Sequence, residues 1–186
     1  MEYRKLPRGG EEISILGFGT SSVGSAGEKE AEKTVELALE NGINYFDMAS
    51  ADAVPFSVFG NTLGSRRKDV YFQIHFGACY DTGVYGWTVD LDKIKRSVDW
   101  QLKALKTDYI DFGFLHCIDE EADLKEAETA GTIRYIKELQ EAGVVRRIGL
   151  STHTPVIANK LLDTGILDML MFSINPAYDY RHGEYA

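Results

Sequence analysis

Apolar runs and amphipathic segments alternate along this chain, and their order predicts which parts are helices and which are strands. The clearest helix carries one apolar stripe at i, i+4, i+8 and i+11, formed by Ile94, Val98, Leu102 and Leu105. Similar spacing predicts helices over 28–41, 133–142 and 155–165, and a short helix within 51–64.

Shorter apolar runs lie between these helices and predict strands. They cover 42–47, 70–75, 109–116, 145–150 and 167–173, after a glycine-rich strand end at 17–20. Two short segments flanking Arg8-Gly9-Gly10 predict a hairpin over 3–16. The acidic segment 119–128 predicts a solvated loop.

The alternation of strands with helices predicts an α/β fold with a parallel sheet. An open doubly wound sheet would need a third glycine after Gly17-Phe18-Gly19-Thr20-Ser21-Ser22, and it is missing. A barrel is therefore favoured, but a complete one has eight strands and about 250 residues. We expect an incomplete (β/α)8 TIM barrel of about six strands with an N-terminal β-hairpin. Residues 1–186 would form one domain, truncated before the last βα units, and its open barrel edges could support self-association.

Charge and cysteine content narrow the possible partners. The formal net charge of -9 argues against nucleic acid or an anionic membrane surface. No apolar run approaches the ~20 residues of a membrane span. Two cysteines, Cys79 and Cys117, without paired spacing indicate a reducing compartment. We expect a cytoplasmic protein with no nucleic-acid and no membrane partner.

Ionisable side chains end three of the predicted strands: Asp47, His75 and His116. In a parallel barrel the C-terminal strand ends converge on the face that carries active sites. These three residues should therefore look into one site. No tyrosine occurs between Phe46 and Val70.

Five motifs follow one another along the chain: Gly17-Phe18-Gly19-Thr20, Gly42-Ile43-Asn44-Tyr45-Phe46-Asp47, Thr107-Asp108-Tyr109-Ile110-Asp111, Leu115-His116 and Ile148-Gly149-Leu150-Ser151. In this order they resemble the N-terminal three-quarters of an aldo-keto reductase. The finer pattern is similar to bacterial members that add a ferredoxin-like cluster domain, which has no counterpart within these 186 residues. The resemblance implies an oxidoreductase that reduces a small-molecule carbonyl substrate with NADPH.

The family's catalytic tetrad is Asp, Tyr, Lys and His, and this chain matches only half of it. By the resemblance, Asp47 takes the place of the aspartate and His116 that of the histidine. Asp52 stands where the tyrosine belongs, and His75 where the lysine belongs. An aspartate is normally ionised at neutral pH and would repel a developing oxyanion, whereas a histidine can donate a proton there. Asp47, Asp52, His75 and His116 are thus the candidate catalytic residues, with Tyr80 and Tyr85 as substitute proton donors or as rim-packing aromatics.

The resemblance also implies where a cofactor would lie. Gly19 and Thr20 match the first strand end beside it, Asp47 adjoins it, and Ser151 and Thr152 match the pair that holds the nicotinamide carboxamide. The segments that hold adenine and the 2′-phosphate follow the family's seventh strand. We therefore expect weak or absent NADPH binding by this chain.

Two other function classes remain open. The replaced tyrosine and lysine fit a non-catalytic relative that binds a nucleotide or a partner. Two carboxylates and two imidazoles at neighbouring strand ends also fit the ligand set of a metal-dependent barrel enzyme. The family itself uses no metal.

Overall fold

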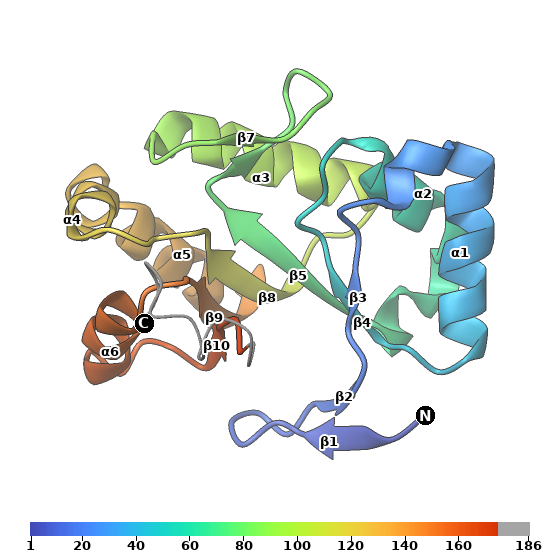
Figure 1. The fold of residues 1–186 in the computed structure, drawn as a ribbon, viewed down its shortest axis with the longest axis horizontal. Coiled ribbons are helices and arrows are strands. Elements are labelled where there is room, and N and C mark those ends of the chain that lie inside the picture. Colours follow the sequence, from blue (N-terminus) through green and yellow to red (C-terminus); the bar gives the residue numbers. More distant parts are fainter. Residues whose placement is uncertain (175–186) are drawn as a thin grey trace.

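The computed structural model describes residues 1–174 and shows a curled six-stranded parallel sheet with helices around its outer side (Figure 1). The strands of this sheet are β3 (Phe18–Gly19), β4 (Tyr45–Asp47), β5 (Tyr71–Phe76), β8 (Ile110–Leu115), β9 (Val145–Ser151) and β10 (Met169–Met171). Their spatial order is β10-β9-β8-β5-β4-β3, so β3 and β10 are the two edges. The sequence-based expectation of an incomplete barrel with six strands is confirmed.

The arc curls far enough for side chains of separated strands to meet inside it. The Gln73 amide on β5 donates to the Met171 sulfur on β10, at 3.6 Å, although β8 and β9 lie between these strands. Inward-facing residues alternate along β5, because successive side chains of a strand point to opposite faces. Tyr71, Gln73 and His75 share a face, and Phe72 and Ile74 lie on the opposite one, in the core.

The N-terminal hairpin is also confirmed, as β1 (Tyr3–Lys5) paired antiparallel with β2 (Glu12–Ser14). It lies below the start of β4, where Ser14 N donates to Asn44 Oδ1 at 2.8 Å. Glu11 next to it pairs with Arg147 of β9, at 2.9 Å. The hairpin therefore covers the N-terminal strand ends, and the opposite ends stay available for a site.

The helices are α1 (Glu28–Glu40), α2 (Val54–Thr62), α3 (Leu91–Ala104), α4 (Glu121–Ala130), α5 (Thr132–Glu141) and α6 (Pro155–Asp163), with two 3-10 turns, η1 (Val23–Ala26) and η2 (Gly64–Asp69). The prediction of a solvated loop over 119–128 was wrong, because most of it belongs to α4. Only Leu124 and Ala127 of α4 are buried, so the apolar stripe is too thin to show as a helical pattern. Gly131 ends α4 with φ 89°, a left-handed conformation that favours glycine.

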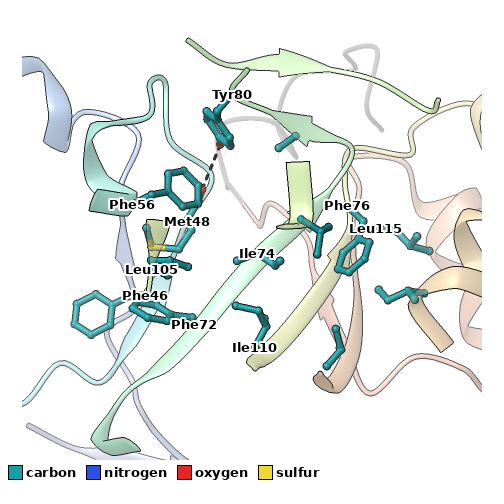
Figure 2. Close-up of a cluster of buried hydrophobic side chains, with 14 of the residues drawn as sticks. Phe46, Met48, Phe56, Phe72, Ile74, Phe76, Tyr80, Leu105, Ile110 and Leu115 are labelled. Carbon is teal, nitrogen blue, oxygen red and sulfur yellow. Dashed lines mark hydrogen bonds between the residues drawn. The ribbon is translucent and has the colours of Figure 1, made fainter. Parts of the chain in front are cut away.

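Large aromatic and aliphatic side chains fill the layer between the sheet and its helices (Figure 2). Phe46, Phe59 and Phe72 are fully buried, and their rings meet edge to face with centroids 4.8 to 6.4 Å apart. Such contacts add to the stabilisation from buried apolar area. This packing fixes β4 and β5 side by side, and with them the residues at their C-terminal ends.

A second small hairpin stands over those ends. It consists of β6 (Ala78–Cys79) and β7 (Gly86–Trp87) and follows directly after β5 (Figure 1). Trp87 Nε1 donates to His116 O at 3.1 Å, and Thr88 N donates to Gly77 O at 2.9 Å. These bonds tie the hairpin to the ends of β5 and β8.

Candidate functional site

Asp47 and His75 form the first contact of the site, from neighbouring parallel strands. Asp47 ends β4, and His75 lies on β5 one pleat above Gln73, the residue paired with Asp47. His75 Nε2 lies 2.7 Å from Asp47 Oδ1. The His75 side chain is 1% exposed and that of Asp47 is 19% exposed. The carboxylate therefore faces the open side of the arc, and the imidazole lies beneath it.

His75 and His116 form the second contact. Their Nδ1 atoms are 2.8 Å apart, and their rings meet edge to face with centroids 4.6 Å apart. The pairing of β5 with β8 brings them together, because His75 is paired with Phe114 and His116 follows two residues later on the same face. Both imidazoles are buried, His75 at 2% and His116 at 5% exposure.

Tyr85 forms the third contact. Its hydroxyl lies 2.9 Å from His116 Nε2, and the residue is 40% exposed. It reaches His116 from the loop of the β6–β7 hairpin, which Trp87 anchors to the same residue. We call Asp47, His75, His116 and Tyr85 the hydrogen-bonded series.

The charges in the series follow from its surroundings. Burial alone would raise the pKa of Asp47, but the hydrogen bond from His75 and the neighbouring imidazoles hold it below its ordinary value. Burial, with the charge of His75 as a smaller cause, lowers the pKa of His116 to about 3. At neutral pH Asp47 is thus a carboxylate that only accepts, and His116 is a neutral imidazole. Burial raises the pKa of Tyr85, which keeps its hydroxyl protonated.

Asp52, the residue in the position of the family's tyrosine, stands apart from the series. Its Oδ1 accepts from Val54 N at 2.8 Å, at the start of α2, and its N–H donates to Ser50 Oγ at 3.3 Å. A Cβ added to Gly24 would meet the Asp52 carboxylate at 2.2 Å, so that carboxylate packs on the backbone after β3. Within residues 1–174 it shares no hydrogen bond with Asp47, His75 or His116. Its observed contacts are those of a turn residue at a helix start.

The two tyrosines that sequence analysis considered as substitute donors differ in position. The Tyr80 hydroxyl lies under the loop after β4, where it contacts Met48 O at 3.3 Å and accepts from Ser50 N at 3.1 Å (Figure 2). Tyr80 is 2% exposed, so it packs as a core aromatic. Only Tyr85 combines an exposed ring with a bond to the site.

The expected cofactor residues lie at the ends of β3, β4 and β9, and most of them are engaged within the protein. Thr20 is fully buried and donates to Asp47 O at 2.9 Å. The Thr152 hydroxyl contacts Ile118 O at 2.7 Å and Asp119 Oδ1 at 2.9 Å, and it accepts from Thr154 N. Ser151 is buried and bonds the Cys117 thiol. A Cβ added to Gly19 would meet no atom within 4 Å, so open space lies above that strand end, next to its partner Asp47.

Asp119 lies in a loop, as expected, and its side chain is 33% exposed, but its carboxylate is bound within the protein. Its carboxylate accepts from Thr152 Oγ1, from His153 N at 2.6 Å and from His153 Nδ1 at 2.9 Å. Burial alone would raise the pKa of Asp119, but these bonds from His153 and Thr152 lower it. Asp119 therefore holds the loop after β9 beside the site.

Gln73 is a site neighbour that the sequence analysis did not single out. Its amide nitrogen lies 3.0 Å from His75 Nε2, and its amide oxygen accepts from the Tyr45 hydroxyl. Gln73 is fully buried. Its place two residues before His75 was the available signal, because residues i and i+2 of a strand share a face.

A metal site finds no support in the geometry. Within the described part of the chain, no group of three or more His, Cys, Asp or Glu side chains could hold a metal ion. The reason is the pairing inside the series: His75 and His116 turn their Nδ1 atoms toward each other, and their Nε2 atoms contact Asp47 and Tyr85.

No helix among the residues described here is long and apolar enough to cross a membrane.

The strand order, the covered N-terminal end and the polar groups at the C-terminal strand ends define an α/β-barrel fold. The model of the aldo/keto reductase family matches residues 15–177. The chain therefore belongs to the aldo/keto reductase family, and it is an oxidoreductase-family domain.

Individual relatives agree with this assignment. The chain is 34% identical over its whole length to the uncharacterized oxidoreductase YqkF of Bacillus subtilis, covering 60% of that protein. It is 28% identical to L-galactose dehydrogenase of Arabidopsis thaliana, with 92% of this chain and 56% of the relative covered. The holo form of an aldo-keto reductase from Bacillus halodurans superposes with a TM-score of 0.75 at 29% identity, over 94% of this chain and 58% of that one. The chain thus spans little more than half the length of these relatives.

Proposed function

We propose that this chain carries the catalytic face of an NADPH-dependent oxidoreductase that interconverts a small carbonyl compound and the corresponding alcohol. The observation that carries the proposal is the series of three hydrogen bonds from Asp47 through both histidines to Tyr85, at the strand ends of an aldo/keto reductase barrel. A bound nicotinamide would supply or accept the hydride. The protein's own residues would position the substrate and exchange one proton with its oxygen.

The charge pattern supports a positioning role for Asp47 and His75. The Asp47 carboxylate can only accept, so it fixes the hydrogen of His75 on Nε2 and orients that imidazole. An imidazolium at position 75 would then take the place of the positive charge that the family's lysine supplies. Gly19 is paired with Asp47 and has open space above it, and we expect Gly19, Asp47 and Ser151 to hold the nicotinamide.

We expect this chain to contact only part of the cofactor. The residues that would grip adenine and the 2′-phosphate in the family come after its seventh strand, whereas the described sheet ends at β10. We expect the nicotinamide half of the cofactor to supply most of the contact with this chain. NADPH would then bind weakly.

A non-catalytic relative is the competing proposal, and two observations favour it. Asp52, which the resemblance places at the family's tyrosine, lies outside the series, and the Thr152 hydroxyl contacts Ile118 O and Asp119. Such a protein would bind a nucleotide or a partner without turnover. The exposed edge strands β3 and β10 would allow self-association.

A deuteride-transfer assay separates the two proposals. The purified chain is incubated with 4-deuterated NADPH and a panel of small aldehydes, and the alcohol is analysed for deuterium on the carbinol carbon. Enzyme-dependent label, lost in Asp47→Asn, supports the oxidoreductase. Unlabelled substrate at millimolar cofactor, from a protein that stays folded, supports the non-catalytic relative.

A further inference from the structure

We propose that Tyr85 is the residue that exchanges the proton with the substrate oxygen, and that His116 and His75 pass this proton to and from Tyr85 above the Asp47 carboxylate. This inference rests on the proposed oxidoreductase function. It assigns the missing acid to a hairpin residue outside the position where the family's tyrosine lies.

Exposure along the series selects Tyr85. The two ends of the series are accessible, with Tyr85 40% exposed and the Asp47 side chain 19% exposed, whereas both histidines are buried. A substrate approaching the open face meets the phenol and the carboxylate before it meets either imidazole. An ionised carboxylate has no proton to give, so the phenol is the accessible donor.

Both ring nitrogens of His116 contact other side chains of the series, so neither is free to meet a substrate. Its Nδ1 faces His75 Nδ1 at 2.8 Å, and its Nε2 faces the Tyr85 hydroxyl at 2.9 Å. A carbonyl could reach His116 Nε2 only by displacing the phenol. The hydroxyl of Tyr85 therefore occupies the place from which a proton can leave the protein.

The hydrogen bonds of the series can run in two directions along it, and the two resulting states differ by one proton. When His75 is an imidazolium, it donates through Nε2 to Asp47 and through Nδ1 to His116 Nδ1. His116 Nε2–H then donates to the Tyr85 oxygen, and the Tyr85 hydrogen points outward. When His75 is neutral, Tyr85 donates to His116 Nε2, and His116 Nδ1–H donates to His75 Nδ1. In both directions each of the three contacts of the series, Asp47–His75, His75–His116 and His116–Tyr85, has one donor and one acceptor.

Carbonyl reduction converts the first direction into the second. The substrate oxygen would take the Tyr85 proton, which breaks the phenol O–H bond and completes the alcohol, while a bound reduced nicotinamide would supply the hydride to the carbonyl carbon. The phenolate takes the Nε2 proton of His116, and His116 Nδ1 takes the Nδ1 proton of His75. The net change is one hydride and one proton gained by the substrate, and one proton lost by His75. Oxidation of the alcohol runs the same steps backwards.

Two neighbouring groups are less suited to this role. The Tyr80 hydroxyl bonds backbone atoms of Met48 and Ser50, and the residue is 2% exposed. The Cys117 sulfur lies 3.7 Å from His116 Nδ1, the nitrogen that already faces His75. Neither group therefore lies at the outer end of the series, where Tyr85 contacts His116 Nε2.

The test combines turnover with a measurement that needs no cofactor. Tyr85→Phe removes only the hydroxyl, and Tyr135→Phe on α5 is the matched control that removes a phenol outside the site. We expect Tyr85→Phe to lower single-turnover hydride transfer about 100- to 10,000-fold, the range typical of general acid catalysis, with an unchanged KM. In ¹⁵N-histidine spectra of the protein without cofactor, Tyr85→Phe should shift the ring nitrogens of His116, and Tyr135→Phe should leave them in place.

The possible outcomes are distinct. If the unmodified chain turns over and Tyr85→Phe is equally fast, the role of Tyr85 is overturned while the proposed function stands. If no deuteride is transferred by the unmodified chain, the proposed function fails, and the catalytic role of Tyr85 fails with it. Unshifted His116 resonances in a folded Tyr85→Phe protein would overturn the link between phenol and imidazole. Site-specific 3,5-difluorotyrosine at position 85, which keeps the ring and acidifies its hydroxyl, should move the pH profile of turnover to lower pH, and an unmoved profile would overturn the proposal.

Discussion

His75 and His116 face each other through their Nδ1 atoms at 2.8 Å, inside the barrel and beneath the open ends of β5 and β8. A contact between two ring nitrogens holds one hydrogen, so the tautomer of one imidazole determines that of the other. Because the outer nitrogens contact Asp47 and Tyr85, a change at either end of the series reaches the other end.

The burial of His116 makes stability depend on pH. Its pKa is lowered to about 3 in the folded protein from an ordinary value of 6.5, so the unfolded chain binds a proton that the folded chain does not bind in that interval. Stability therefore falls as pH decreases from 6.5 toward 3, by up to about 1.4 kcal/mol per pH unit. Urea unfolding at pH 7 and pH 5 should show this loss, and His116→Gln should reduce it. His153→Gln, at an exposed histidine, is the control and should retain it; a His116→Gln protein with the full loss would contradict the account.

Asp52 and Asp47 should respond differently to removal of charge. Asp52→Ala removes the acceptor for Val54 N at the start of α2, and we expect it to cost about 1 kcal/mol of unfolding free energy with little change in turnover. Asp47→Asn keeps the size of the side chain but removes the negative charge that contacts His75 Nε2 at 2.7 Å. We expect it to lower hydride transfer at least about tenfold. Thermal unfolding and single-turnover rates measured on both variants check this, and a larger loss of turnover in Asp52→Ala would contradict it.

The direction of the reaction should determine the sign of its pH dependence. Reduction begins with the extra proton on the series and oxidation begins without it, so reduction should slow and oxidation should accelerate as pH rises. The groups that face the histidines are the Asp47 carboxylate, the Gln73 amide, the Cys117 thiol and the Tyr85 phenol, with Asp119 and His153 acting on His116 through space. The measured midpoint belongs to this coupled set. Rates in both directions from pH 5 to 9 test the prediction, and parallel profiles would contradict it.

Cofactor truncation should show which half of NADPH this chain contacts. Reduced nicotinamide mononucleotide lacks the adenosine and the 2′-phosphate but keeps the hydride donor. If Gly19, Asp47 and Ser151 supply the main contacts, it should bind within about tenfold of NADPH, a difference of about 1.4 kcal/mol. Fluorescence titration of the chain with both cofactors measures this. Binding of NADPH alone, at micromolar affinity, would locate an adenosine site within this chain.

The barrel and three of the four residues of the series were predictable because both follow from regular periodicity. Apolar strands that end on Asp47, His75 and His116 place those residues on one face once the sheet is parallel, and the pairing of β4, β5 and β8 agrees. The α4 helix was not predicted, since it has only two buried residues among acidic ones.

The remaining features of the site depend on which strand ends the loops contact after folding. Tyr85 reaches His116 because the β6–β7 hairpin folds back over the strand ends, and no sequence period records that fold-back. Asp52 was predicted to share the site because of its position in the family motif. Its carboxylate instead accepts from Val54 N within its own loop, and its backbone N–H donates to Ser50 Oγ. Asp119 likewise acquires its role from the loop after β9, which is distant in sequence.

The central claim is that the strand-end series of this chain transfers a proton while hydride moves between nicotinamide and a carbonyl. Its most direct measurement is the deuterium content of the alcohol formed from an aldehyde and 4-deuterated NADPH, with the unmodified chain and with Asp47→Asn compared at equal concentration. The account predicts one deuterium on the carbinol carbon with the unmodified chain and at least about tenfold less alcohol with Asp47→Asn. Absence of labelled alcohol with the folded, unmodified chain at millimolar cofactor, or equal yields from both proteins, would contradict it.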